Sequence, residues 1–462
     1  MNNTVWSIFV DIGLVSILLL LGQWMRSRIV IFQKLLLPAS MIAGFLGLIL
    51  GPNGFEWLPF SAFIVSYPGI LIAFIFASLP FSSKDFVLKT GGRRAGEIGT
   101  YSSIAVLWQW GLGTLFALAV LSFIWPELHP GFGTLLAAGF VGGHGTAAAI
   151  GSTFMDRGWD EAQSLAMISA TVGILCSIVG GMLWIRWGSQ KGVTNFITPF
   201  KDLPDELRTG LIPENKRESV GSETVSPLAI DPIIFHFAII ASAAVIGYYI
   251  GIWSSDLMSD YRIPTFSLAF LVAILLKWGL KMFRGYQYID QKISLRLCGA
   301  FTDLLVVFGI TSIQIPLLIK YAFPLFGLFI VGILICWALF FYLGPIVFRE
   351  NWFEKSLYTW GWVTGIMAIA IALLRIVDAK NKANILSDFA VAYFAIGPLE
   401  VLLVTLAPVL IMNGSQWGFS IVTLGAGILL LLIILFLKMR MAAECNPQDP
   451  GKPHQITDIR SE

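Results

Sequence analysis

The sequence predicts an all-α polytopic membrane protein with two inverted five-helix repeats, each carrying a re-entrant hairpin, and one extra C-terminal transmembrane helix. Three observations predict this class. The 462 residues are 56% hydrophobic and only 13% charged, about half the charge of an ordinary soluble domain. Apolar runs long enough to cross the roughly 30 Å hydrocarbon core recur along the chain. Finally, two glycine-interrupted apolar segments occupy matching places in its two halves.

The apolar runs define the domain organisation. The first repeat occupies residues 1–187 and the second residues 232–412, with a charged linker at 188–231 that cannot lie in lipid. The extra helix covers 413–438, and a polar tail follows at 439–462. Spans are predicted at 5–24, 35–51, 64–81, 99–124, 163–186, 232–253, 264–279, 296–316, 321–348, 388–412 and 416–437.

The placement of lysine and arginine indicates how the two interrupted segments, 132–152 and 358–376, are threaded. If both are re-entrant, 27 of the 30 basic residues lie on one side of the membrane, and only Arg157, Arg262 and Lys320 lie on the other. If both segments span, the division is 17 against 13. Because basic residues concentrate on the cytoplasmic side, the re-entrant threading is favoured. It predicts an inner (plasma) membrane protein with an external N-terminus and a cytoplasmic linker and tail.

Each half then contains five spans with a hairpin between the fourth and the fifth. Since five is odd, the two halves have opposite orientations. The second spans also begin alike, with LPAS at 37–40 and IPTF at 263–266. Inverted repeats with broken helices at matching places are typical of secondary transporters. The alternative is two unrelated helical bundles joined by a linker.

The most informative motif is GGHGTAAA at 142–149, inside the first hairpin. Glycines permit positive φ and close approach of a ligand, and a helix that starts near mid-membrane offers free N–H groups to a carboxylate. Gly142, Gly143, His144, Gly145 and Thr146 are therefore candidate substrate-binding residues. The simpler interpretation is close packing of small residues between helices. No second histidine or cysteine has ligand spacing, so no metal site is predicted besides that of a transported cation.

Acidic residues within the predicted spans supply candidate cation ligands. Asp11, Asp303 and Glu400 lie in the middle portions, which contain no lysine or arginine. Ionisable groups at this depth are costly and usually line an ion or substrate path. Glu400 is the first choice for a coupling cation and Asp303 the second, whereas Asp11 could reach the outer interface. A neutral carboxyl that is hydrogen-bonded to the backbone is the structural alternative for each.

The segments VGGHGTAAAIGSTF, LPASMIAG and IPTFSLAFLVAILL together resemble the sodium/glutamate symporter family, as does the position of the polar linker. The resemblance covers roughly residues 5–412. It implies re-entrant loops that meet mid-membrane, sodium-coupled glutamate uptake, a homodimer and an elevator-like movement. In that family the later hairpin usually has a histidine and a threonine-proline step, which GWVTGIMA at 361–368 lacks. Thr364 and Gly365 are therefore positional candidates for the substrate site.

These observations predict a secondary transporter, most specifically a sodium-coupled symporter of glutamate or a related amino acid or dicarboxylate. Its expected partners are a glutamate-like anion and the lipid bilayer, with Na⁺ as coupling ion, no other cofactor and no nucleic acid. A proton-coupled carboxylate carrier of the same fold is the main alternative, and a channel is another. A primary pump is not expected, because no nucleotide-binding motif is found, and an enzyme is not expected, because no paired catalytic constellation is found.

Overall fold

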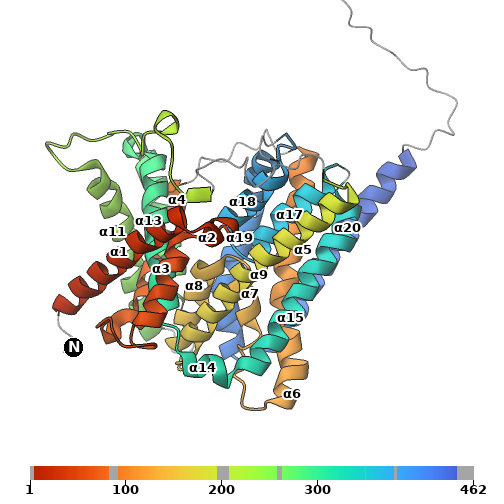
Figure 1. Ribbon diagram of the computed structural model, residues 1–462, viewed down its shortest axis with the longest axis horizontal. Helices are drawn as coiled ribbons and strands as arrows, with labels where there is room; N and C mark the ends of the chain where they lie inside the picture. Colours follow the sequence, from red (N-terminus) through yellow and green to blue (C-terminus); the bar gives the residue numbers. More distant parts are fainter. Residues whose placement is uncertain are drawn as a thin grey trace, which may run out of the picture.

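The computed structural model describes residues 5–82, 92–194, 208–257, 263–348, 350–378 and 382–444. Regular structure in these residues is helical, which confirms the predicted all-helical class (Figure 1). Within the described ranges, nine helical runs are long and apolar enough to cross a membrane. They are α1 (Val5–Arg28), α5 to α6 (Arg93–Ile124), α9 (Ala162–Lys191), α11 (Pro232–Leu257), α12 (Thr265–Met282), α13 (Gln291–Thr311), α15 to α16 (Ala322–Val347), α19 (Ile385–Met412) and α20 (Gln416–Glu444).

The second and third predicted spans form shorter helices. α3 (Ala39–Leu50) begins after Pro38, whose φ of −58° and ψ of 144° are not helical, and ends at Gly51. At 1.5 Å per residue, its 12 residues cover roughly 18 Å, less than the hydrocarbon thickness. α4 (Tyr67–Ser82) has 16 residues. Hydropathy identified the apolar segments here, but it could not show where each helix begins.

The order of elements is the same in the two halves of the chain. Pro38 and Pro264 both precede the second helix, with nearly equal backbone angles. The fourth helix of each half contains a π-helical turn, at Ala117–Leu121 and at Leu339–Leu343. A broken helix pair and a long final helix follow in each half. Because π turns are rare, their recurrence at the same place marks corresponding elements.

The helices pack in two groups that lie side by side (Figure 1). The lateral group contains the first three helices of each half, α1, α3, α4, α11, α12 and α13. The hairpin group contains the fourth helix, the broken helix pair and the long final helix of each half, together with α20. α5 and α9 are the most buried of the long spans, whereas α1, α11 and α20 are the most exposed. The hairpin group therefore has a well-packed centre, and three long helices present apolar surface at the periphery.

α14 (Ile315–Lys320) carries the chain from α13 of the lateral group to α15 of the hairpin group. Its C-terminal residue Lys320 donates to Glu161 at 2.8 Å, and the Tyr321 hydroxyl also donates to Glu161. Burial by itself would raise the pKa of the Glu161 carboxyl, but these hydrogen bonds outweigh burial and lower it. The same connection is held by Gln314, whose backbone N–H donates to the Ser164 hydroxyl at 2.8 Å.

The corresponding connection of the first half, residues 83–91, lies outside the described residues. So do residues 195–207 of the predicted linker and residues 445–462 of the predicted tail. The remaining part of the linker contacts the start of α13, because Ser222 N–H donates to Asp290 at 3.0 Å and the Thr224 hydroxyl to the Tyr288 carbonyl at 2.7 Å.

Candidate functional site

The first predicted hairpin is a pair of short helices joined by Val141 and Gly142. α7 (Thr134–Phe140) ends at Phe140, and α8 (Gly143–Met155) begins after Gly142. Gly142 has φ +83° and Gly143 has φ +60°, backbone conformations that favour glycine. At the other end of the pair, the His129 ring stacks on Trp159 with centroids 4.2 Å apart. The segment therefore turns back on itself and brings its first and last residues together.

The second predicted hairpin has the same form. α17 (Trp352–Val363) ends before Thr364 and Gly365, and α18 (Met367–Val377) starts after Ile366, which is extended with φ −140° and ψ 157°. The two arms lie against each other, because a Cβ on Gly361 would come within 2.7 Å of Ala370 Cα. Glycine at 361 permits this close contact between the arms.

The two hairpin tips meet. A Cβ on Gly143 would lie 2.6 Å from Ile366 Cγ2 and 3.3 Å from the Gly365 carbonyl oxygen. Both tips also contact α9, since a Cβ on Gly173 would lie 2.8 Å from the Thr364 oxygen and 3.2 Å from the Gly139 oxygen. The structure thus brings together the glycines of both sequence-predicted loops, which are separated by more than two hundred residues in the chain.

The helix ends at this junction have complementary polarity. α8 and α18 begin here, so their first turns present N–H groups and a positive dipole end. α7 and α17 end here, so their last carbonyls present a negative dipole end. Thr364 hydroxyl donates back to the Trp360 carbonyl at 2.6 Å, and Thr146 lies in the first turn of α8 beside Gly142. Such a junction can bind an anion and a cation close to each other.

His144 lies in the first turn of α8 and is 1% exposed. Its Nε2 lies 3.1 Å from the Thr171 hydroxyl, which itself donates to the Met167 carbonyl at 2.9 Å. Among the described residues, the second ring nitrogen, Nδ1, is buried without a hydrogen-bond partner.

Gly145, the third glycine of the motif, has no positive φ and has only Ile72 Cδ1 near its Cβ position, at 3.7 Å. The expectation of positive φ thus holds for Gly142 and Gly143 but not for Gly145, which is an ordinary helical residue.

Two polar residues that the sequence reasoning missed hold the second tip. Gln109 of α5 is fully buried and donates through Nε2 to the Val363 carbonyl at 2.7 Å. The Ser177 hydroxyl of α9 donates to the Gly361 carbonyl at 3.0 Å. The available signal was a polar amide in the middle of an apolar span, within LWQWGLG at 107–113. Both side chains bind the last carbonyls of α17 and fix the point at which that helix ends.

The predicted cation ligands lie on different helices. Glu400 is half-buried on α19 and accepts from the Tyr393 hydroxyl at 3.0 Å, while the Tyr393 ring contacts Trp362 of the second hairpin with centroids 6.3 Å apart. Glu400 is thereby connected to the hairpin group. Asp303 is exposed on α13 of the lateral group, with Ser40 of the LPAS segment within hydrogen-bonding reach. The structure therefore gives the two carboxylates separate surroundings.

Asp11 has a structural role. Its buried carboxylate accepts from the Ser61 N–H at 2.9 Å, the Ser61 hydroxyl at 2.5 Å and the Tyr67 hydroxyl at 2.8 Å. These bonds fasten the α3–α4 connection to α1. The structural interpretation is thus favoured for Asp11, but its donors are two side-chain hydroxyl groups as well as one backbone N–H, and the carboxylate accepts all three bonds.

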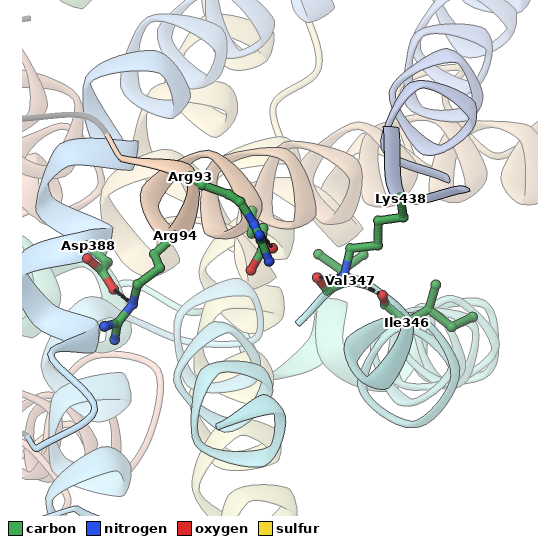
Figure 2. Close-up of polar contacts among 7 residues, drawn as sticks. Arg93, Arg94, Ile346, Val347, Asp388 and Lys438 are labelled. Atoms are coloured by element: carbon green, nitrogen blue, oxygen red, sulfur yellow. Dashed lines mark hydrogen bonds and ion pairs between the residues drawn. The ribbon is translucent and has the colours of Figure 1, made fainter. Parts of the chain in front are cut away.

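Charged side chains gather at the end of the hairpin group that holds the base of the second hairpin (Figure 2). Arg94 Nε lies 3.0 Å from an Asp388 oxygen and ties α5 to α19, and Arg93 pairs with Glu97 at 3.2 Å within α5. Lys355 of α17 is buried nearby, with its ammonium 5.4 Å from the centre of the Phe348 ring. Arg94 thereby joins α5 to α19, and Lys355 packs the base of the second hairpin against Phe348.

A pocket of about 240 Å³ lies away from the tips, at the far end of α8. It is lined by Thr153, Asp156 and Arg157 of the first hairpin and by α11 and α12 residues such as Tyr248 and Thr265. It therefore marks a seam between the hairpin and lateral groups. Among the described residues, no cluster of three or more His, Cys, Asp or Glu side chains could hold a metal ion.

Comparison with known proteins finds one family. Residues 6–352 match the family model described as sodium/glutamate symporter. The chain is 24% identical over 325 residues to the sodium/glutamate symporter of Escherichia coli K12, covering 68% of this chain and 75% of that protein, and the Shigella flexneri protein of the same description gives the same figures. No solved structure matches. The family match ends at the first residue of α17, so the divergent second hairpin lies beyond it.

Proposed function

The chain belongs to the sodium/glutamate symporter family, and from this premise we propose that it couples inward Na⁺ movement to uptake of glutamate or a closely related amino acid. It is a multi-pass membrane transporter of that family. The observation that carries the proposal is the meeting of two broken helices at their glycine tips, where Gly143 contacts Gly365 and Ile366. Broken helices that meet in this way form the substrate and ion sites of many secondary transporters.

The proposed substrate site is the junction of the tips. The first turn of α8, with Gly142, Gly143, His144, Gly145 and Thr146, offers N–H groups and a hydroxyl to a substrate carboxylate. Gly142, Gly145 and Thr146 are partly exposed, so a ligand can approach this turn from one side. Thr364 and Gly365 complete the site from the second tip. A carboxylate at a helix N-terminus is favoured both by the unpaired N–H groups and by the dipole.

The groups proposed to coordinate the cation are all oxygen atoms, from backbone carbonyls and from a carboxylate. The Gly139 and Thr364 oxygens both approach Gly173, and they come from the carboxyl ends of two half-helices. Carbonyl oxygens at such ends coordinate Na⁺ in broken-helix transporters. Glu400 supplies the first candidate negative charge and Asp303 the second. A proton on Glu400 would give the alternative, a proton-coupled carrier of the same fold.

The proposed movement is an elevator-like shift of the hairpin group against the lateral group. Three observations support it: the two groups pack separately, a pocket lies between them, and the short helix α14 connects α13 of the lateral group to α15 of the hairpin group. The re-entrant threading, the external N-terminus, the inner-membrane location and the homodimer belong to the same proposal. The homodimer is supported by the family resemblance alone.

A reconstituted uptake assay tests the proposal. Purified protein in liposomes receives an inward Na⁺ gradient, and uptake of labelled glutamate, aspartate, glutamine and glutarate is compared. We expect accumulation of glutamate above its external concentration, abolished when K⁺ replaces Na⁺. Accumulation driven by a pH gradient in K⁺ medium would instead support proton coupling. Flux that only equilibrates glutamate would indicate a channel and refute the symporter.

A further inference from the structure

The hydrogen bonds of His144 fix its tautomer. Thr171 has one hydroxyl proton, which it donates to the Met167 carbonyl at 2.9 Å. Its oxygen therefore accepts in the 3.1 Å contact with His144, and Nε2 of that ring carries the proton. Nδ1 is then the acceptor of a neutral imidazole. A second proton on the ring would find no acceptor among the described residues and would leave a buried, unpaired charge.

This Nδ1 lone pair is a buried acceptor without a donor in the described part of the chain. Nδ1 is bonded to Cγ, so it stays close to the backbone of His144, which belongs to the same first turn of α8 as the proposed carboxylate site. A buried acceptor without a donor is costly, and each such group in a folded protein calls for an explanation. A ligand that carries N–H groups beside a carboxylate would satisfy both features of this turn together.

We propose that neutral His144 recognises the α-ammonium group of the substrate, an inference that rests on the proposed function of the hairpin tips. Nδ1 accepts one ammonium N–H, while the substrate carboxylate binds the first turn of α8. The Gly365 carbonyl, 3.3 Å from the Cβ position of Gly143, is a second acceptor on the facing tip. The site therefore selects α-amino acids over dicarboxylates of the same length. Because Nδ1 is covered in this conformation, the ammonium reaches it in a conformation that exposes this nitrogen.

Two matched substitutions isolate the role of Nδ1. His144→Asn places an amide oxygen, bonded to Cγ, near the position of Nδ1. His144→Gln places an amide nitrogen near the position of Nε2, so it keeps a donor for Thr171 but removes the acceptor. The measured quantities are dissociation constants for glutamate and for glutarate, which lacks the ammonium, obtained in Na⁺ by calorimetry. Gel filtration and melting curves report folding.

We expect wild type and His144→Asn to prefer glutamate over glutarate. In His144→Gln, glutamate affinity should fall roughly ten- to hundredfold, the range for losing a hydrogen bond to a charged group, with glutarate affinity nearly unchanged. An unaltered preference in His144→Gln would overturn the inference while leaving the proposed function standing. If neither variant folds, the wild-type protein still tests the inference: equal dissociation constants for glutamate and glutarate would overturn it. Wild type that binds neither ligand would refute the proposed function as well.

Discussion

Replacing Gly143 with alanine tests whether the contact between the hairpin tips is needed for transport. The residue has φ +60°, a conformation that costs any residue with a Cβ roughly 1–2 kcal/mol. The new Cβ would also lie 2.6 Å from Ile366 Cγ2, so that one of the two tips must move. The backbone cost alone lowers the population of the native tip by roughly five- to thirtyfold. We therefore expect Gly143→Ala to reduce uptake at least fivefold.

Initial rates of Na⁺-driven uptake in proteoliposomes measure this effect, with protein incorporation quantified in the same vesicles. Gly13→Ala is the matched control, because Gly13 lies within α1, has no positive φ and has nothing within 4 Å of its Cβ position. It should transport normally and melt no lower than wild type. Uptake by Gly143→Ala within twofold of wild type would show that the tips do not need this close contact.

Three further predictions concern coupling, pH and topology. Glu400→Gln should shift the Na⁺-activation curve to higher concentration while solute exchange survives; an unchanged curve would transfer the ion role to Asp303. Hydrogen bonds lower the pKa of Glu161 in the folded protein below the ordinary glutamate value of 4.5. The interaction of Glu161 with Lys320 therefore stabilises the fold fully at pH values above 4.5, and this stabilisation is lost as the pH falls through the lowered pKa. Melting temperatures of Glu161→Gln should therefore depend less on acid pH than those of wild type, and parallel curves would contradict this. A reporter fused at residue 210 should be cytoplasmic; an external signal would mean that the first broken segment spans the membrane.

The architecture was predictable where it depends on local composition. Apolar runs marked the long helices, and glycines marked both breaks, because hydropathy and backbone freedom are properties of the residues themselves. The π turn at Ala117–Leu121 and its counterpart were not predictable, since nothing in ALAVL or LFFYL distinguishes them from ordinary helix. The lengths of α3 and α4 were overestimated mainly because apolar residues precede the points where those helices begin.

The candidate site was predictable only in part. GGHGT identified the first tip, but the donor from Gln109 to the Val363 carbonyl joins residues that are 254 positions apart. The tautomer of His144 depends on Thr171, which lies on another helix. The sequence around His144 does not indicate that Thr171 is its hydrogen-bond partner. Asp11 resembled the other membrane acids in sequence, although its partners Ser61 and Tyr67 make it structural. The hydrogen-bond partners of these polar residues therefore depend on the tertiary structure and could not be read from the local sequence.

The extra helix α20 is fastened to the hairpin group along its length. The Ser420 hydroxyl donates to the Gly111 carbonyl at 2.8 Å, Phe419 packs edge-to-face on Trp110, and Lys438 donates to the Ile346 carbonyl at 2.7 Å (Figure 2). A displacement of the hairpin group would therefore carry a full-length apolar helix through the acyl chains. Changing the match between that helix and the bilayer costs fractions of a kcal/mol per Å. If the proposed shift of the hairpin group occurs, membrane thickness should affect the relative stability of its positions, and lipids of different chain length should alter the turnover of the carrier.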